Sequence, residues 1–162
     1  MLDANVLVDF QAADLSLLTL ASRHIGKVHI ISSVLQEVEG LDETDCLRLG
    51  LHVVEPTLDQ ALEAAMSGRQ LSFEDRLCLV VCRDNGWTCV SNDKALRKSC
   101  KDSGISVLWG LQLILELVHG GHLPAHEAVE AAERIHRTNP YISTPILESF
   151  RKKIAILVKR TG

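Results

Sequence analysis

The chain has 162 residues, of which 46% are hydrophobic, and its formal net charge is −4. This length suits one domain with a substantial core, and no run reaches the ~18 uninterrupted apolar residues of a membrane span. The negative charge excludes nucleic-acid binding driven by bulk positive charge, so any contact with phosphate must be local or bridged by a metal.

Short β-rich runs alternate with longer helical patterns over the first 109 residues. This alternation predicts a parallel sheet with helices on both faces, that is, a three-layer α/β/α fold. The predicted strands are 1–6, 27–31 ("KVHII"), 52–54 ("HVV"), 88–91 ("TCVS") and 106–109 ("SVLW"). The predicted helices are 15–24, 33–40, 43–50, 57–67, 72–86 and 93–104.

Only helical patterns follow residue 109. They cover 111–121, 125–137 after Pro124, and 145–160 after a cap at Ser143 or Thr144. No linker or low-complexity segment separates them from the preceding part. We therefore expect a single domain, 1–162, in which a helical C-terminal extension, 110–162, packs on an α/β core, 1–109.

Four acidic residues stand where predicted strands end or helices begin. Asp3 lies on the first strand, and Asp93 directly follows the fourth. Glu37 lies about one turn into the helix after the second strand, and Asp75 lies in the first turn of the helix before the fourth strand. Because ligands of open α/β sheets bind at the carboxyl ends of the strands, all four carboxylates can face one rim of the sheet.

Four carboxylates at one rim require a cation. Their mutual repulsion and desolvation would raise their pKa values, and Mg²⁺ or Mn²⁺ prefers oxygen ligands. Such a site suits phosphodiester hydrolysis by a metal-activated water. We expect Asn5 either to cap the first helix or to hold Asp3 and a metal-bound water. The expected metal ligands are Asp3, Glu37, Asp75 and Asp93.

Four short motifs, in order over residues 1–108, carry a resemblance to a known family. They are "LDANVLVDF", "SSVLQEVEG", "LSFEDRLCLVV" and "VSNDKALR", and each contains one of the four acids. With these motifs the chain resembles the PIN-domain ribonucleases, close to the VapC-type toxin branch. The resemblance implies a central parallel sheet with strand order 3-2-1-4-5 and metal-dependent endonucleolytic cleavage of RNA.

The resemblance also bears on partners and on the start of the chain. Toxin-like members often dimerise and pair with a small antitoxin protein, so a second copy and an antitoxin are expected partners beside RNA. The family usually has several apolar residues before its first Asp, whereas only Met1 and Leu2 precede Asp3. Either the first strand is clipped short or the true start lies upstream.

Three of the four acids also have a purely structural interpretation, whereas neither a cap nor a surface position explains Asp3. Asp75 forms a capping box with Ser72, and Asp93 can cap its own helix. Glu37 can be a solvated helix residue, with Glu39 as the ligand instead. The fold would then be an idle scaffold that binds RNA or a protein. A phosphatase with Asp3 as nucleophile is disfavoured, because Asn5 cannot act as the general acid two residues later.

Other residues carry less specific signals. Asp9 is interpreted as a helix-surface or capping residue, and Trp109 as a core residue. Basic residues 97, 98 and 101, and a second group at 151–153, either track an RNA backbone or form solvated faces. Five cysteines without paired CxxC spacing argue against a disulfide scaffold and a zinc knuckle. No basic region followed by an apolar block precedes the domain, so we expect no signal peptide, no membrane association and a cytoplasmic location.

Overall fold

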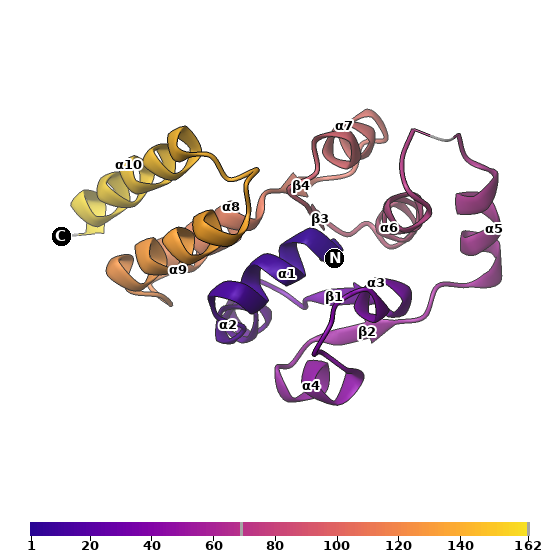
Figure 1. Ribbon diagram of the computed structural model, residues 1–162, viewed down its shortest axis with the longest axis horizontal. Coiled ribbons are helices and arrows are strands. Elements are labelled where there is room, and N and C mark those ends of the chain that lie inside the picture. The colour runs from indigo at the N-terminus through magenta and orange to yellow at the C-terminus, as the bar shows by residue number, and fades with distance from the viewer. Residues whose placement is uncertain (69, 162) are drawn as a thin grey trace.

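The computed structural model describes residues 1–68 and 70–161 and is built mainly of helices (Figure 1). Helices α9 and α10 lie at one end of the molecule and α5 at the opposite end, with the short strands between them. The elements in chain order are α1 (Ala4–Ala13), α2 (Ser16–His24), β1 (His29–Ile31), α3 (Ser32–Gln36), α4 (Glu43–Arg48), β2 (His52–Val54), α5 (Leu58–Met66), α6 (Phe73–Asn85), β3 (Cys89–Val90), α7 (Lys94–Asp102), β4 (Val107–Leu108), α8 (Gly110–His119), α9 (Ala125–Thr138) and α10 (Thr144–Thr161).

The expected three-layer α/β/α fold with a central parallel sheet of order 3-2-1-4-5 is wrong. The structure is 64% helix and 7% strand, and it has two separate two-stranded parallel sheets. One sheet pairs β1 with β2 and places His29 opposite His52, and the other pairs β3 with β4 and places Cys89 opposite Val107. The strands are only two or three residues long, and the segment between the two sheets forms only an isolated bridge, between Leu2 and Val90.

The first predicted strand, 1–6, is mostly helix. Helix α1 begins at Ala4, because Val6, Leu7 and Phe10 recur at helical spacing and all three are fully buried. Only residues 1–3 remain extended. Leu2 forms an isolated parallel bridge with Val90 instead of a strand.

Main-chain hydrogen bonds nevertheless fix residues 1–3 between β1 and β3 (Figure 1). The Leu2 N–H donates to the His29 carbonyl at 2.8 Å, and the Asp3 N–H donates to the Val90 carbonyl at 3.0 Å. The Val90 N–H donates to the Met1 carbonyl at 2.8 Å. Asp3 is thereby held beside the loop that joins β3 to α7.

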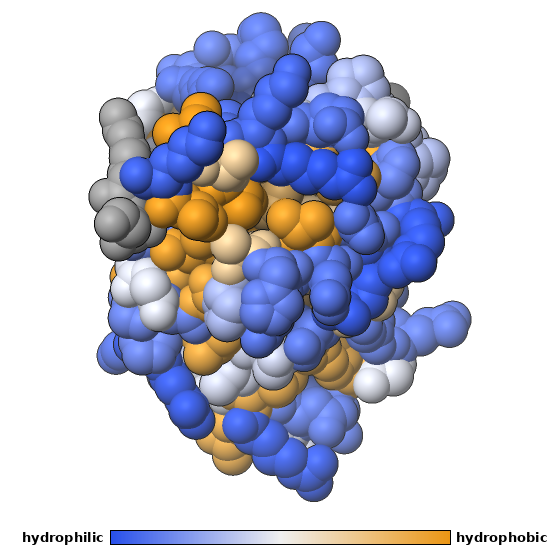
Figure 2. Space-filling model, turned by 90° about the vertical axis from the view of Figure 1, so that its left-hand side faces the viewer, coloured by the Kyte–Doolittle hydropathy of each residue, from blue (hydrophilic) through white to orange (hydrophobic). Residues whose placement is uncertain are grey.

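The apolar core runs through the whole described chain. Helix α9 packs against α1, and α10 packs against α8 and α9. The last helix supplies Leu147, Phe150 and Ile154 to this core, whereas its Val158 is 49% exposed. Figure 2 looks onto the end of the molecule that carries these helices and shows apolar side chains gathered among polar ones.

Within the described residues, no single helix has the length and apolar character needed to cross a membrane. The bent pair α1 and α2 would meet that requirement by length and composition only.

Candidate functional site

Asp3 is a buried carboxylate that does not serve as a helix cap. It occupies the position just before α1, yet its side chain makes no capping hydrogen bond to that helix. It is 5% exposed, and its Oδ2 accepts a hydrogen bond from the Ser91 hydroxyl at 2.8 Å. Burial raises the pKa of Asp3, the Ser91 bond lowers it, and the charges of Asp75 and Asp93 raise it further. Neither helix capping nor solvent exposure explains why an Asp stands here among buried residues, so a functional role is the remaining explanation.

Ser91 connects Asp3 to Asp93. The buried Ser91 hydroxyl also accepts a hydrogen bond from the Asp93 main-chain N–H at 3.0 Å. Oδ1 of Asp93 caps α7 by accepting from the Leu96 N–H at 2.7 Å, which confirms the capping interpretation. The cap engages one of the two carboxylate oxygens, so it is compatible with a second role for the other.

Asp75 also takes part in two kinds of interaction, a helix cap and an electrostatic one. It forms the predicted capping box with Ser72 at the start of α6, through bonds of 3.0 and 3.3 Å. Its charge raises the pKa of both Asp3 and Glu37. Asp75 therefore lies within electrostatic reach of two of the other predicted ligands.

Glu37 and Asn5 are the two outer members of the predicted set. Glu37 directly follows the short helix α3 and is exposed, and burial, then the charges of Glu74 and Asp75, raises its pKa. Asn5 is an exposed residue in the first turn of α1. Neither side chain is held in place as firmly as Asp3.

The carboxylates influence one another electrostatically but do not form a tight cluster. Among the described residues, the set of acidic, His or Cys side chains whose ligand atoms all lie within 4.8 Å of one another is Cys78, Cys82 and Cys89. Mg²⁺ usually keeps several waters and binds through only one or two carboxylates, so the wider spacing still fits it. The donor chemistry fits as well, because a carboxylate whose pKa is raised by burial and by neighbouring acids is stabilised by a cation.

A polar network around the buried Asp9 lies beside the acids, and it was not predicted from the sequence. Asp9 is 4% exposed, so its assignment to the helix surface is wrong. It accepts hydrogen bonds from Asn92 Nδ2 at 2.7 Å and from Asn139 Nδ2 at 2.9 Å. Burial raises the pKa of Asp9, although these two hydrogen bonds act to lower it. Oδ1 of Asn92 in turn accepts from the Gly110 N–H at 3.1 Å. The network joins α1, α8 and the end of α9 to the loop that carries Ser91 and Asp93.

The signals for this network were weak. Asp9 lies three residues after Val6 and next to Phe10, on the buried face of α1, so its helical position could have shown that it is internal. Ser91 is fully buried and ends the predicted strand "TCVS", but a serine there is compatible with simple packing. Asn139 is 130 residues from Asp9, and no sequence pattern links them.

Arg97 and Trp109 form a pair next to Ser91. The Arg97 guanidinium donates to the Ser91 carbonyl at 3.1 Å and lies 3.7 Å from the centre of the Trp109 ring. Arg97 is buried, so it is neither a solvated nor a freely exposed basic residue. Trp109 is 36% exposed, so its interpretation as a core residue is wrong.

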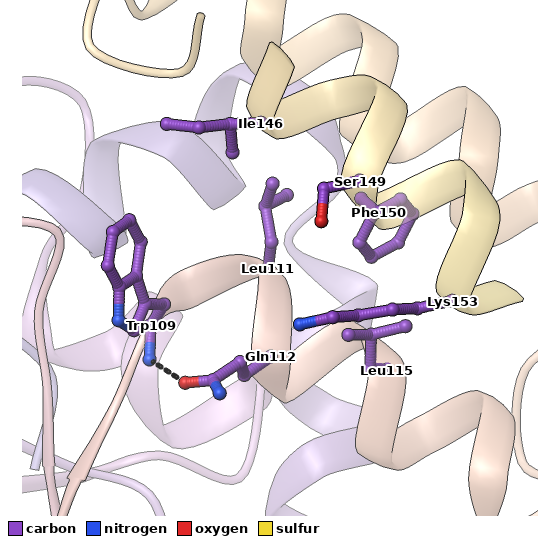
Figure 3. A pocket seen from close by; sticks show the side chains of 8 residues that line it. All are labelled: Trp109, Leu111, Gln112, Leu115, Ile146, Ser149, Phe150 and Lys153. Carbon is purple, nitrogen blue, oxygen red and sulfur yellow. Dashed lines mark hydrogen bonds between the residues drawn. The ribbon is translucent and has the colours of Figure 1, made fainter.

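Trp109 also borders a hollow of about 310 Å³ between α8 and α10 (Figure 3). Its walls are largely apolar, and the Lys153 amine reaches into it from α10. The Gln112 side chain accepts a hydrogen bond from the main-chain N–H of Trp109 at 2.8 Å and lies at one side of the opening. The lining residues are Trp109, Leu111, Gln112, Leu115, Ile146, Ser149, Phe150 and Lys153.

Comparison of the chain with protein-family models, with curated proteins and with solved structures found no match. The resemblance to PIN-domain ribonucleases is therefore not tested by relatives and stays a prediction. Function has to be argued from the site itself.

Proposed function

We propose that this chain is a metal-dependent endoribonuclease that uses Mg²⁺ or Mn²⁺ to hydrolyse RNA phosphodiester bonds. The observation that carries the proposal is the electrostatic coupling at Asp3. A carboxylate 5% exposed, with one side-chain hydrogen bond and two acidic neighbours, is costly to keep ionised unless a cation joins it. The proposed ligands are Asp3, Glu37, Asp75 and Asp93.

The roles of the chain's own groups follow from their contacts. Ser91 orients Asp3 by donating to Oδ2 and places Asp93 by accepting from its N–H. Asp75 is held by its capping box at the start of α6, and Glu37 supplies the exposed side of the site. Asn5, in the first turn of α1, is positioned to contact a water beside Asp3. When bound, the metal would supply a water of lowered pKa and positive charge at the scissile phosphate.

RNA binding by an acidic chain needs local features, and the Arg97–Trp109 pair provides them. The exposed part of Trp109 can stack on a base, a contact worth roughly 1–3 kcal/mol per base. Lys153 offers a positive charge in the neighbouring hollow (Figure 3). Because Arg97 binds the carbonyl of Ser91, this surface adjoins the acidic site.

A second candidate, the catalytically idle scaffold, is favoured by one observation. Asp75 and Asp93 already take part in helix capping. The four carboxylates are also more widely spaced than the sulfur atoms of Cys78, Cys82 and Cys89. In that case the same surface would bind RNA or a partner protein without cleavage. An antitoxin protein, a second copy of the chain, a toxin role and a cytoplasmic location belong to the nuclease proposal, and the free cysteines agree with the last.

The test is RNA cleavage by purified protein with Mn²⁺ and then with EDTA, on structured and unstructured RNA. Wild-type protein should cleave only with the metal, and Asp3→Asn should abolish cleavage while keeping the hydrogen bond from Ser91. Asp59→Asn is the matched control, because it makes the same chemical change at an exposed position in the first turn of α5. Metal-independent RNA binding without cleavage would favour the scaffold and overturn the nuclease.

A further inference from the structure

Three of the five cysteines bring their sulfur atoms together in the core, and a fourth lies nearby. Cys78 and Cys82 lie one turn apart on α6, Cys89 lies on β3, and Cys100 lies on α7. All four are at most 1% exposed. The sulfur atoms of the first three lie within 4.8 Å of one another, and those of Cys78 and Cys89 are 4.0 Å apart. Cys100 lies beyond this spacing but interacts electrostatically with Cys89.

This geometry is close to that of a tetrahedral thiolate site. With metal–sulfur bonds of about 2.3 Å, the sulfur atoms of a tetrahedral zinc site stand about 3.8 Å apart. The 4.0 Å between the Cys78 and Cys89 sulfurs needs little adjustment to reach that spacing.

We propose that Cys78, Cys82 and Cys89, with Cys100 as the fourth ligand, form a buried structural site for Zn²⁺. Thiolates are soft ligands that select zinc and copper(I) over Mg²⁺ or Mn²⁺, so this site differs in kind from the carboxylate site. The ligands come from α6, β3 and α7. The ion would therefore tie together the elements that carry Asp75 and Asp93.

One basic side chain acts on the cluster. The Arg97 guanidinium is electrostatically coupled to Cys89 and can offset part of the buried negative charge. Asp3 and Asp75 act on Cys100 in the opposite sense. A divalent ion is the remaining source of compensation for several buried thiolates.

The sequence did not reveal this site. A zinc knuckle is recognised by paired CxxC motifs, whereas here a one-turn helical pair joins single cysteines from a strand and another helix. The argument against a zinc knuckle holds for that motif but does not extend to a site assembled by the fold. Because the sulfurs are inaccessible in the folded chain, we expect the ion to enter during folding.

The test measures metal content and a sulfur-specific spectrum. Protein refolded with Zn²⁺ and freed of excess metal should contain about one zinc per chain. Refolding with Co²⁺ should give the thiolate-to-cobalt charge-transfer absorption, which carboxylate ligands cannot produce. Cys78→Ala and Cys89→Ala should each lose most of that absorption. Cys46→Ala is the matched control, since Cys46 is equally buried but lies on α4 outside the cluster.

Two further measurements keep the proposal falsifiable if a variant fails to fold. Asp3→Asn should keep the absorption, because the acidic site does not contribute sulfur. In folded wild-type protein, zinc should stay bound during a brief EDTA treatment, and it should be released once urea unfolds the chain and exposes the thiols to a mercurial. Zinc-free wild-type protein without the cobalt absorption, or zinc that leaves with EDTA alone, would overturn the proposal.

Discussion

Replacing Asp9 by alanine tests whether the buried network holds the site loop in place. In the folded protein the Asp9 carboxylate accepts from Asn92 Nδ2 at 2.7 Å and from Asn139 Nδ2 at 2.9 Å. Alanine would leave both amides without an acceptor, at about 1–3 kcal/mol for each buried donor. Removing a carboxylate whose burial raises its pKa returns part of that cost. We therefore expect a loss of roughly 2–4 kcal/mol in the free energy of unfolding.

Urea unfolding followed by circular dichroism measures this loss. The matched control is Asp59→Ala, at an exposed position in the first turn of α5, which should cost less than about 1 kcal/mol. Asn139→Ala removes one of the two donors, so the double variant Asp9→Ala/Asn139→Ala should cost less than the sum of the two single variants. A loss for Asp9→Ala no larger than that of the control would refute the argument.

Three other predictions concern the acidic site and its surroundings. Ser91→Ala removes the hydroxyl that orients Asp3, so Mn²⁺ affinity from calorimetry should fall about 10–100-fold, and unchanged affinity would contradict its positioning role. Trp109→Ala should weaken RNA binding roughly 5–150-fold in fluorescence anisotropy while leaving Mn²⁺ affinity intact, because it removes the stacking surface only. The third prediction is a pH dependence. Because the pKa of Asp3 in the folded protein is raised above 3.8, its folded state is favoured while the group is protonated, and that contribution is lost as pH rises through the raised pKa. Metal-free wild-type protein should therefore lose stability relative to Asp3→Asn over this rise, and Mn²⁺ should reverse the difference. Parallel curves for the two proteins would count against the coupling.

Local structure was predictable where the local sequence signals for an element agreed. The capping box of Ser72 and Asp75 and the cap of α7 at Asp93 were predicted and are confirmed. The helix after Pro124 was expected over 125–137 and extends over Ala125–Thr138. In each case a cap residue or a proline before the first turn agrees with a helical apolar period, so no tertiary contact is needed to decide.

Long-range arrangement was not predictable in the same way. Residues 1–6 have a strand-like composition, but Val6 also begins a helical spacing that continues with Leu7 and Phe10. Burial of that helical face decides in favour of α1. The strands at β1–β4 are near their predicted places, but their pairing stops after two or three residues. The expected continuous sheet therefore does not form.

The candidate site was only partly accessible from the sequence. The isolated acid Asp3 was informative because neither a surface position nor a cap explained it, and the structure places it beside Ser91 and within reach of Asp75 and Asp93. Ser91, the Asp9 network and the cysteine cluster depend on residues brought together from distant parts of the chain. Such convergence leaves no spacing pattern that a single sequence can show.

A crystal grown with Mn²⁺ and measured for anomalous scattering tests the central claim most directly. We predict a manganese peak beside Asp3, bound by its carboxylate and, directly or through water, by Asp75 and Asp93. No peak at Asp3, with its carboxylate still contacting Ser91 alone, would contradict the metal-dependent nuclease.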